Sequence, residues 1–123
     1  MGAVPPPPTA GVLPGVSFAS GSARLLPESY QALDSVTRLL RANPSARVEI
    51  SAHTDNVGSP ADNLRLTVRQ AEAVRDYLVI KGVPIDQIVA RGYGATVPLT
   101  PDTTPRGRAA NRRVEIRPAA PGP

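Results

Sequence analysis

The sequence of 123 residues contains no cysteine and no tryptophan, and aromatic residues make up only 3% of it. Without cysteine the chain forms no disulfide bonds, has no thiolate nucleophile and offers no cysteine ligands for zinc. A single histidine, His53, also leaves too few ligands for a typical transition-metal site. The core must therefore consist of Leu, Val, Ile and Ala, and few groups are left for catalysis.

Long apolar runs are missing as well. None approaches the roughly 20 residues that cross a bilayer, so we expect no transmembrane segment in this chain. The first residues lack the charged and apolar regions of a signal peptide, so an exported protein would be a mature or excised piece. Gly92 and Gly94 follow a predicted strand but lack the third glycine and the helix of a phosphate-binding loop. We expect no enzyme and no cofactor.

The net charge of +4 comes almost entirely from arginine, since Lys81 is the only lysine. Five arginines cluster near the C-terminus, namely Arg106, Arg108, Arg112, Arg113 and Arg117. Such a cluster can bind nucleic acid, but here acidic residues are interspersed and no aromatic stacking platform accompanies the arginines. We therefore expect no nucleic-acid partner.

The chain has fifteen prolines and ten glycines, and they are unevenly spread. Many prolines gather in the run from Pro5 to Pro8 and in the tail from Pro118 to Pro123, and segments of this composition typically stay extended. We predict a flexible proline-rich linker over residues 1–13, one domain over residues 14–118 and a disordered tail over residues 119–123.

Hydrophobic periodicity in the first half of the domain predicts strand, helix and strand. Residues 16–18 alternate as a short strand. Apolar residues then recur at helical spacing from Pro27 to Leu40, and Asn43 and Pro44 end that helix. Residues 47–53 alternate strictly, which is typical of a strand with one face against helices.

The second half of the domain is expected to form one helix and two strands. A second helix is expected to begin at Thr67, because Thr67 and Gln70 fit a capping box, and to stop at Gly82. Strands follow over residues 88–93 and 111–117, with a loop over residues 95–105 between them. The order β-α-β-α-β-β predicts an α+β fold, a two-layer sandwich with two helices packed on one face of a small mixed sheet. The last strand can join antiparallel.

Asp55 lies just past the carboxyl end of the strand over residues 47–53, and its loop leads into the second helix. Open α/β sheets bind ligands at this edge. Asp55 would attract a cation and the free N–H groups of the helix start an anion, so together they suit a zwitterion. Equally, Asp55 could only cap its turn. His53 could be oriented by Asp55, but a simple hydrogen bond from a strand-end histidine is the favoured role.

Several spaced motifs of this sequence resemble the C-terminal domain of the OmpA family, over about residues 14–117. They are Phe18, Gly21-Ser-Ala23 and Leu26-Pro27-Glu28 at the opening, His53 to Gly58, Asn63, Leu66-Thr67, Ala71 and Val74 in the centre, and Gly92-Tyr-Gly94, Pro98 and Gly107 to Glu115 at the close. The resemblance implies the same sandwich fold. It also implies non-covalent binding of cell-wall peptidoglycan, through the diaminopimelate of the stem peptide.

The resemblance further implies roles for single residues. Asp55 matches the acidic residue that binds the ammonium group of diaminopimelate, and Asn63 matches an asparagine of the binding loop. Arg112 belongs to a segment near the site. From the residues alone, Arg112 and Arg113 could instead form ion pairs with Glu115 or Glu49 on the sheet, where exposed pairs contribute little stability.

One position departs from the family pattern, because Gln70 stands where the family has its carboxylate-binding arginine. Arg69 precedes it, but one helical step turns a side chain by about 100°, so Arg69 should leave the site face unless its long stem curls back. Two functions therefore stay open. The domain anchors a larger envelope protein to peptidoglycan, or it has weakened or lost wall binding and serves as an interaction domain for an envelope protein. Either function implies a place in the periplasm or cell envelope, with a tether to the outer membrane through an N-terminal part outside this sequence.

Overall fold

The computed structural model describes residues 10–119, and within them four strands form one mixed sheet in the order β1-β4-β2-β3. The strands are β1 (Gly11–Val12), β2 (Val48–His53), β3 (Ile88–Gly92) and β4 (Arg113–Pro118). β2 pairs in parallel with β3 and antiparallel with β4, as expected for the last strand. The predicted two-layer α+β architecture is confirmed.

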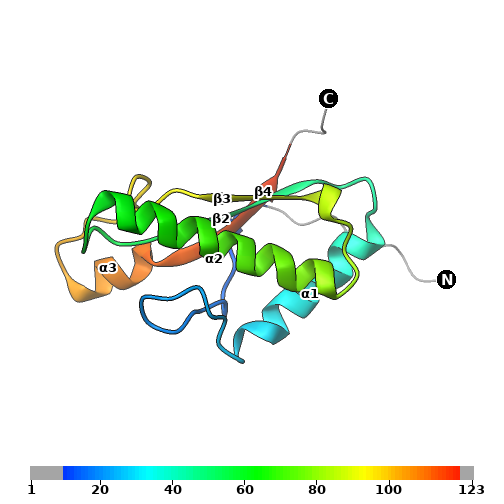
Figure 1. Ribbon diagram of the computed structural model, residues 1–123, viewed down its shortest axis with the longest axis horizontal. Coiled ribbons are helices and arrows are strands. Elements are labelled where there is room, and N and C mark those ends of the chain that lie inside the picture. The colour runs from blue at the N-terminus through cyan, green and yellow to red at the C-terminus, as the bar shows by residue number, and fades with distance from the viewer. Residues whose placement is uncertain (1–9, 120–123) are drawn as a thin grey trace.

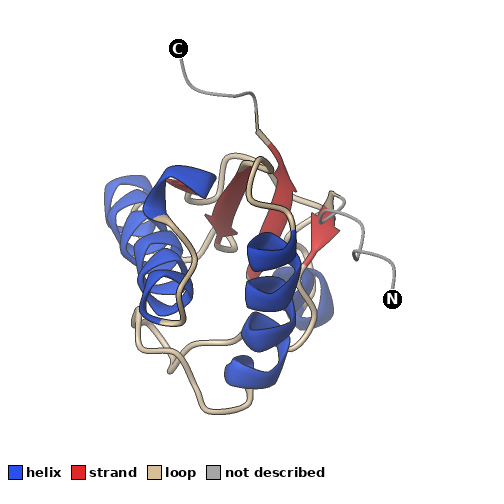
Figure 2. Cartoon of the chain, turned by 90° about the vertical axis from the view of Figure 1, so that its right-hand side faces the viewer, coloured by secondary structure: helices blue, strands red, loops and turns tan. Residues whose placement is uncertain are grey.

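Two long helices, α1 (Ser29–Ala42) and α2 (Pro60–Ile80), lie on one side of the strands (Figures 1 and 2). The apolar faces of the helices and of the strands pack against each other, and their aliphatic side chains form one core. Its buried members are Leu33, Val36, Leu40, Val48, Ile50, Ala52, Ala71, Val74, Leu78, Val83, Ile88, Val114 and Ile116. No helix between residues 10 and 119 is both long and apolar enough to cross a membrane.

The end of α1 is closed by a residue from a distant part of the chain. Gln87, in the 3₁₀ turn Ile85–Gln87, donates from its side-chain amide to the carbonyl oxygens of Leu40, Asn43 and Ala46 at 2.9–3.1 Å. The carbonyls of Leu40 and Asn43 also accept from the N–H groups of Asn43 and Ala46, so Gln87 adds side-chain hydrogen bonds to the backbone hydrogen bonds that end the helix. The helix itself begins at Ser29, two residues after the predicted start at Pro27.

The predicted start of α2 at Thr67 is wrong, because the helix begins seven residues earlier, at Pro60. Its N-cap is Ser59, whose hydroxyl accepts a hydrogen bond from the backbone N–H of Asp62 at 3.1 Å. Serine followed by proline is a favourable helix start. Thr67 lies inside the helix, where its hydroxyl donates to the carbonyl of Asn63 and accepts from the N–H of Gly94 at 2.9 Å.

A third helix, α3 (Pro105–Asn111), was not predicted and lies between the predicted loop over residues 95–105 and the predicted strand over residues 111–117. Thr104 caps it by accepting from the N–H of Gly107 at 3.0 Å, and Pro105 fills the first turn. Thr-Pro is thus a helix start here rather than a loop signal. The side chain of Asn111 ties the helix end to the preceding loop, accepting from the N–H groups of Leu99 and Thr100, so β4 begins only at Arg113.

The folded part also extends beyond the predicted boundaries at residues 14 and 118. Gly11 and Val12 form β1 and pair with β4 through main-chain hydrogen bonds, and the N–H of Ala119 donates to the carbonyl of Arg47 at 2.7 Å. By contrast, the predicted strand over residues 16–18 is reduced to a single bridge between Phe18 and Leu25. The rest of the predicted linker and tail, residues 1–9 and 120–123, lies outside the described residues.

Candidate binding cleft

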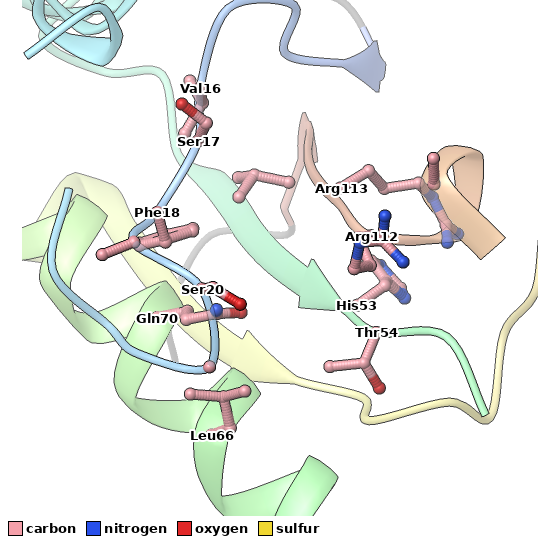
Figure 3. A pocket seen from close by; sticks show the side chains of 14 residues that line it. Val16, Ser17, Phe18, Ser20, His53, Thr54, Leu66, Gln70, Arg112 and Arg113 are labelled. Atoms are coloured by element: carbon pink, nitrogen blue, oxygen red, sulfur yellow. The ribbon is translucent and has the colours of Figure 1, made fainter. Parts of the chain in front are cut away.

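A cleft of about 430 Å³ opens at the carboxyl end of β2. Figure 3 shows Gln70 of α2 and the segment over residues 16–21 on one side of it, with Arg112, at the junction of α3 and β4, facing them. The cleft is lined by residues 16–21, His53, Thr54, Leu66, Gln70, Ala109 and residues 112–114. The start of α2 is not among them, so an anion in the cleft would meet side chains of this helix rather than its first N–H groups.

Asp55 is buried beside the cleft and makes two contacts through its carboxylate. One oxygen, Oδ1, accepts from the N–H of Val57 at 3.0 Å, so Asp55 does cap its turn. The other, Oδ2, forms an ion pair with Nη1 of Arg112 at 2.5 Å. The two side chains differ in exposure, 11% for Asp55 and 56% for Arg112. Arg112 lines the cleft and Asp55 does not, so the guanidinium covers the carboxylate.

Asn63 lies in the first turns of α2 and shapes the loop that carries Asp55. Its side-chain amide donates to the carbonyl of Val57 at 3.0 Å and to that of Asp55 at 3.5 Å. The residue is buried and does not line the cleft. Asn63 therefore positions the loop that carries Asp55.

Gln70 and Arg69 point to different surroundings, as the helical rotation between them predicts. Gln70 lines the cleft, and its amide group donates to the carbonyl of Ser22 at 3.0 Å. Arg69 is exposed and lies outside the cleft. The suggestion that Gln70 completes a capping box with Thr67 is wrong, because both residues are in the body of α2.

The wall formed by residues 16–21 was missed, because its alternation was interpreted as a strand. The segment is held by Ser29, whose fully buried hydroxyl donates to the carbonyl of Ser17 at 2.9 Å and accepts from its N–H at 2.8 Å. A serine at the start of a helix is a sequence signal for such a contact, but its partner twelve residues away is not readable from spacing.

The expected ion pairs of the sheet are found in part. Arg113 pairs with Glu115 at 2.5 Å, as one alternative proposed, whereas Arg112 turns to Asp55. The buried Glu49 is shared by Arg91 and Arg117, at 2.9 and 2.8 Å, on the side of the sheet opposite the helices. Arg112 and Arg113, although adjacent in sequence, thus form ion pairs with different carboxylates.

His53 is not oriented by Asp55. Its Nε2 lies 3.1 Å from the hydroxyl of Ser51, its ring stacks on Tyr93 at 5.2 Å, and its buried Nδ1 has no hydrogen-bond partner among the described residues. Burial, and then the positive charge of Arg113, lower the pKa of His53 below its ordinary value of 6.5. The favoured hydrogen-bonding role therefore fits the geometry better than a role with Asp55.

This lowered pKa predicts a pH-dependent stability. The unfolded chain binds a proton at His53 near pH 6.5 and the folded chain only at lower pH, so the free energy of unfolding should fall as pH drops below about 6.5. Urea unfolding at pH 7.5 and 5.5 measures this. In His53→Gln the change between the two pH values should shrink, since the chain has no other histidine. An equal pH dependence in both proteins would contradict the assignment.

Comparison of the sequence with known protein families identifies the family of this chain. A sequence profile of the OmpA family matches residues 17–112. The chain belongs to the OmpA family. The resemblance drawn from the sequence motifs is thus confirmed, and the OmpA-family match includes all five residues predicted for the site.

Curated OmpA-family relatives are longer than this chain. The peptidoglycan-binding protein ArfA of Mycobacterium tuberculosis is 45% identical over 101 residues, which cover 82% of this chain and 31% of ArfA. Outer membrane protein A of Yersinia pseudotuberculosis is 43% identical over 112 residues, covering 82% and 32%. The chain therefore spans about a third of the length of the curated relatives it matches.

Solved structures with the OmpA-family fold agree with the architecture described above. The peptidoglycan-associated lipoprotein from Burkholderia pseudomallei superposes with a TM-score of 0.76 at 28% identity, over 84% of this chain and 86% of that chain. The mixed sheet with its helical layer is therefore that of a known domain, and the cleft lies at the sheet edge where the family motifs meet.

Proposed function

We propose that this OmpA-family domain binds peptidoglycan non-covalently and thereby anchors a larger protein of the cell envelope to the wall. The names of the relatives support this, since ArfA is called peptidoglycan-binding and the Burkholderia lipoprotein peptidoglycan-associated. The observation that carries the proposal is the charged cleft beside Asp55 and Arg112, on a domain whose chemistry is that of binding rather than catalysis.

The ligand that fits this cleft is the free end of a diaminopimelate side chain, which carries an ammonium and a carboxylate on one carbon. Asp55 supplies a fixed carboxylate for the ammonium, because its Oδ1 accepts a hydrogen bond from the N–H of Val57. Charged hydrogen bonds of this kind are roughly twice as strong as neutral ones. Asn63 keeps the loop in place, and Gln70 offers an amide on the opposite wall.

The domain would act in the periplasm or cell envelope, with the outer membrane as the site of the larger protein's other part. The rival function, an interaction domain with lost wall binding, is motivated by Gln70 in place of the family arginine. It would require an envelope protein as partner in place of peptidoglycan.

An amide NMR titration with a muropeptide that contains diaminopimelate tests the proposal. We expect shifts at Thr54 and Gln70 and in residues 16–21, because these line the cleft. Asp55 should shift as well, because its carboxylate would bind the ammonium group. The far end of the sheet, around Gln87, serves as an internal control and should not shift. If millimolar muropeptide leaves the whole spectrum unchanged, wall binding is lost and the interaction-domain function takes its place.

A further inference from the structure

Resting on the proposed function, we propose that Arg112 supplies the guanidinium that position 70 lacks. In the ligand-free domain Arg112 closes over Asp55, and when the zwitterionic ligand arrives it leaves Asp55 and binds the ligand's carboxylate. The carboxylate-binding group has thus moved from α2 to the opposite wall of the cleft, at the junction of α3 and β4.

On the α2 side of the cleft, no side chain of the described residues can supply a free cation for the ligand's carboxylate. Gln70 is neutral, and its amide donates to Ser22. Arg69 lies outside the cleft. The start of α2, whose N–H groups could have held an anion, also lies outside it. The ligand's carboxylate would therefore find no cation on the α2 wall.

Within residues 10–119 two arginines, Arg112 and Arg113, line the cleft, and they differ in how firmly they are held. Arg113 is only 4% exposed, and all three of its side-chain nitrogens are engaged. Nε pairs with Glu115, Nη1 donates to the carbonyl of Asn111, and Nη2 donates to that of Val97. Turning Arg113 toward a ligand would break three buried contacts, so it is a fixed part of the fold.

Arg112 is placed differently. Its side chain is 56% exposed, and among the described residues the guanidinium contacts only Asp55. The exposed guanidinium can be solvated when it leaves, and the ligand's ammonium takes its place beside the buried carboxylate of Asp55. A guanidinium also presents several donors in a planar fork that matches a carboxylate. Arg112 can therefore move without disturbing the cleft.

The exchange keeps the charges balanced. Arg112 covers Asp55 in the free domain, so the ligand's ammonium can reach Asp55 only if Arg112 withdraws. The released guanidinium then lies beside the ligand's carboxylate. One ion pair within the protein is replaced by two between protein and ligand, and Asp55 stays in place because Val57 still donates to it.

Two matched muropeptides test this proposal by calorimetry, one with diaminopimelate and one with lysine in the stem. Lysine has the same terminal ammonium without the adjacent carboxylate. The parent domain should prefer diaminopimelate by about tenfold or more, as expected for a charged contact. Arg112→Gln should lose this preference while binding the lysine form at least as tightly, because Asp55 is uncovered. Gln70→Arg added to Arg112→Gln should restore the preference.

A control variant and two contrary outcomes complete the test. Arg106→Gln, an exposed arginine of α3 outside the cleft, controls for the loss of one positive charge and should keep the preference. If Arg112→Gln still prefers diaminopimelate, or binds both muropeptides equally more tightly, Arg112 is at most a cover for Asp55 and the proposal is overturned. If the parent domain binds neither muropeptide, the proposed function itself fails.

Discussion

Replacing Asp55 by asparagine is expected to lower the affinity for a diaminopimelate muropeptide by roughly tenfold to 100-fold. A hydrogen bond between charged groups contributes about 1.5–3 kcal/mol, and each 1.4 kcal/mol corresponds to a factor of ten in affinity. Asparagine is nearly isosteric, and its oxygen can still accept from the N–H of Val57. The loop should therefore persist while the ammonium loses its counter-charge.

The fold should survive this change. Asp55 also pairs with Arg112, but that guanidinium is largely exposed and will be solvated when its partner becomes neutral. Asparagine is a better choice than alanine, because alanine would also remove the hydrogen bond that shapes the turn. The thermal midpoint of Asp55→Asn should therefore stay close to that of the parent domain.

Pelleting with purified sacculi and calorimetry with the muropeptide measure the effect. Asp86→Asn is the matched control, since Asp86 is an exposed carboxylate in the 3₁₀ turn after α2 and lies outside the cleft. If Asp55→Asn pellets as well as the parent and Asp86→Asn, the ammonium site has been placed on the wrong residue.

Gly92→Ala is expected to destabilise the domain by about 3 kcal/mol or more, at the upper end of the range for overpacking. A Cβ at this position would lie 2.2 Å from the backbone nitrogen of Val68 and 2.5 Å from the carbonyl carbon of Thr67. Both atoms belong to the helix backbone, which cannot move aside as a flexible side chain would. The change must therefore push α2 away from β3.

Thermal unfolding followed by circular dichroism tests this, and a loss of this size should lower the midpoint by about 10 °C or more. Ala90→Gly, on the same strand, is the control, since it changes one methyl group without a clash and should cost only about 0.5–1 kcal/mol. A midpoint for Gly92→Ala equal to that of the parent would show that α2 does not approach β3 so closely.

The same variant should also weaken muropeptide binding, because Gln70 is carried by the displaced helix. Thr67 holds α2 to the segment after β3 through the N–H of Gly94, and that hydrogen bond spans 27 residues of sequence. The stability of the domain and the geometry of the cleft are therefore coupled where α2 packs on β3. Gly92 is needed for this close approach and not for an unusual backbone angle.

Much of the fold was predictable from local patterns. Strict alternation over residues 47–53 and helical spacing from Pro27 to Leu40 each depend on neighbouring residues, and both elements are present. The helix starts were misplaced for a local reason too. Ser59-Pro60 and Thr104-Pro105 are capping sequences, but their prolines and polar neighbours were interpreted as loop.

By itself, the sequence determined the family, the two-layer order of elements, the place of Asp55 at a strand end and the rotation that takes Arg69 away from Gln70. These follow from periodicity and from the fixed turn of a helix. The tertiary structure alone decided that Arg112 covers Asp55 across 57 positions of sequence, that Gln70 bonds Ser22, and that residues 16–21 wall the cleft. Such contacts depend on how separate elements pack, and packing brings together side chains that no spacing rule relates.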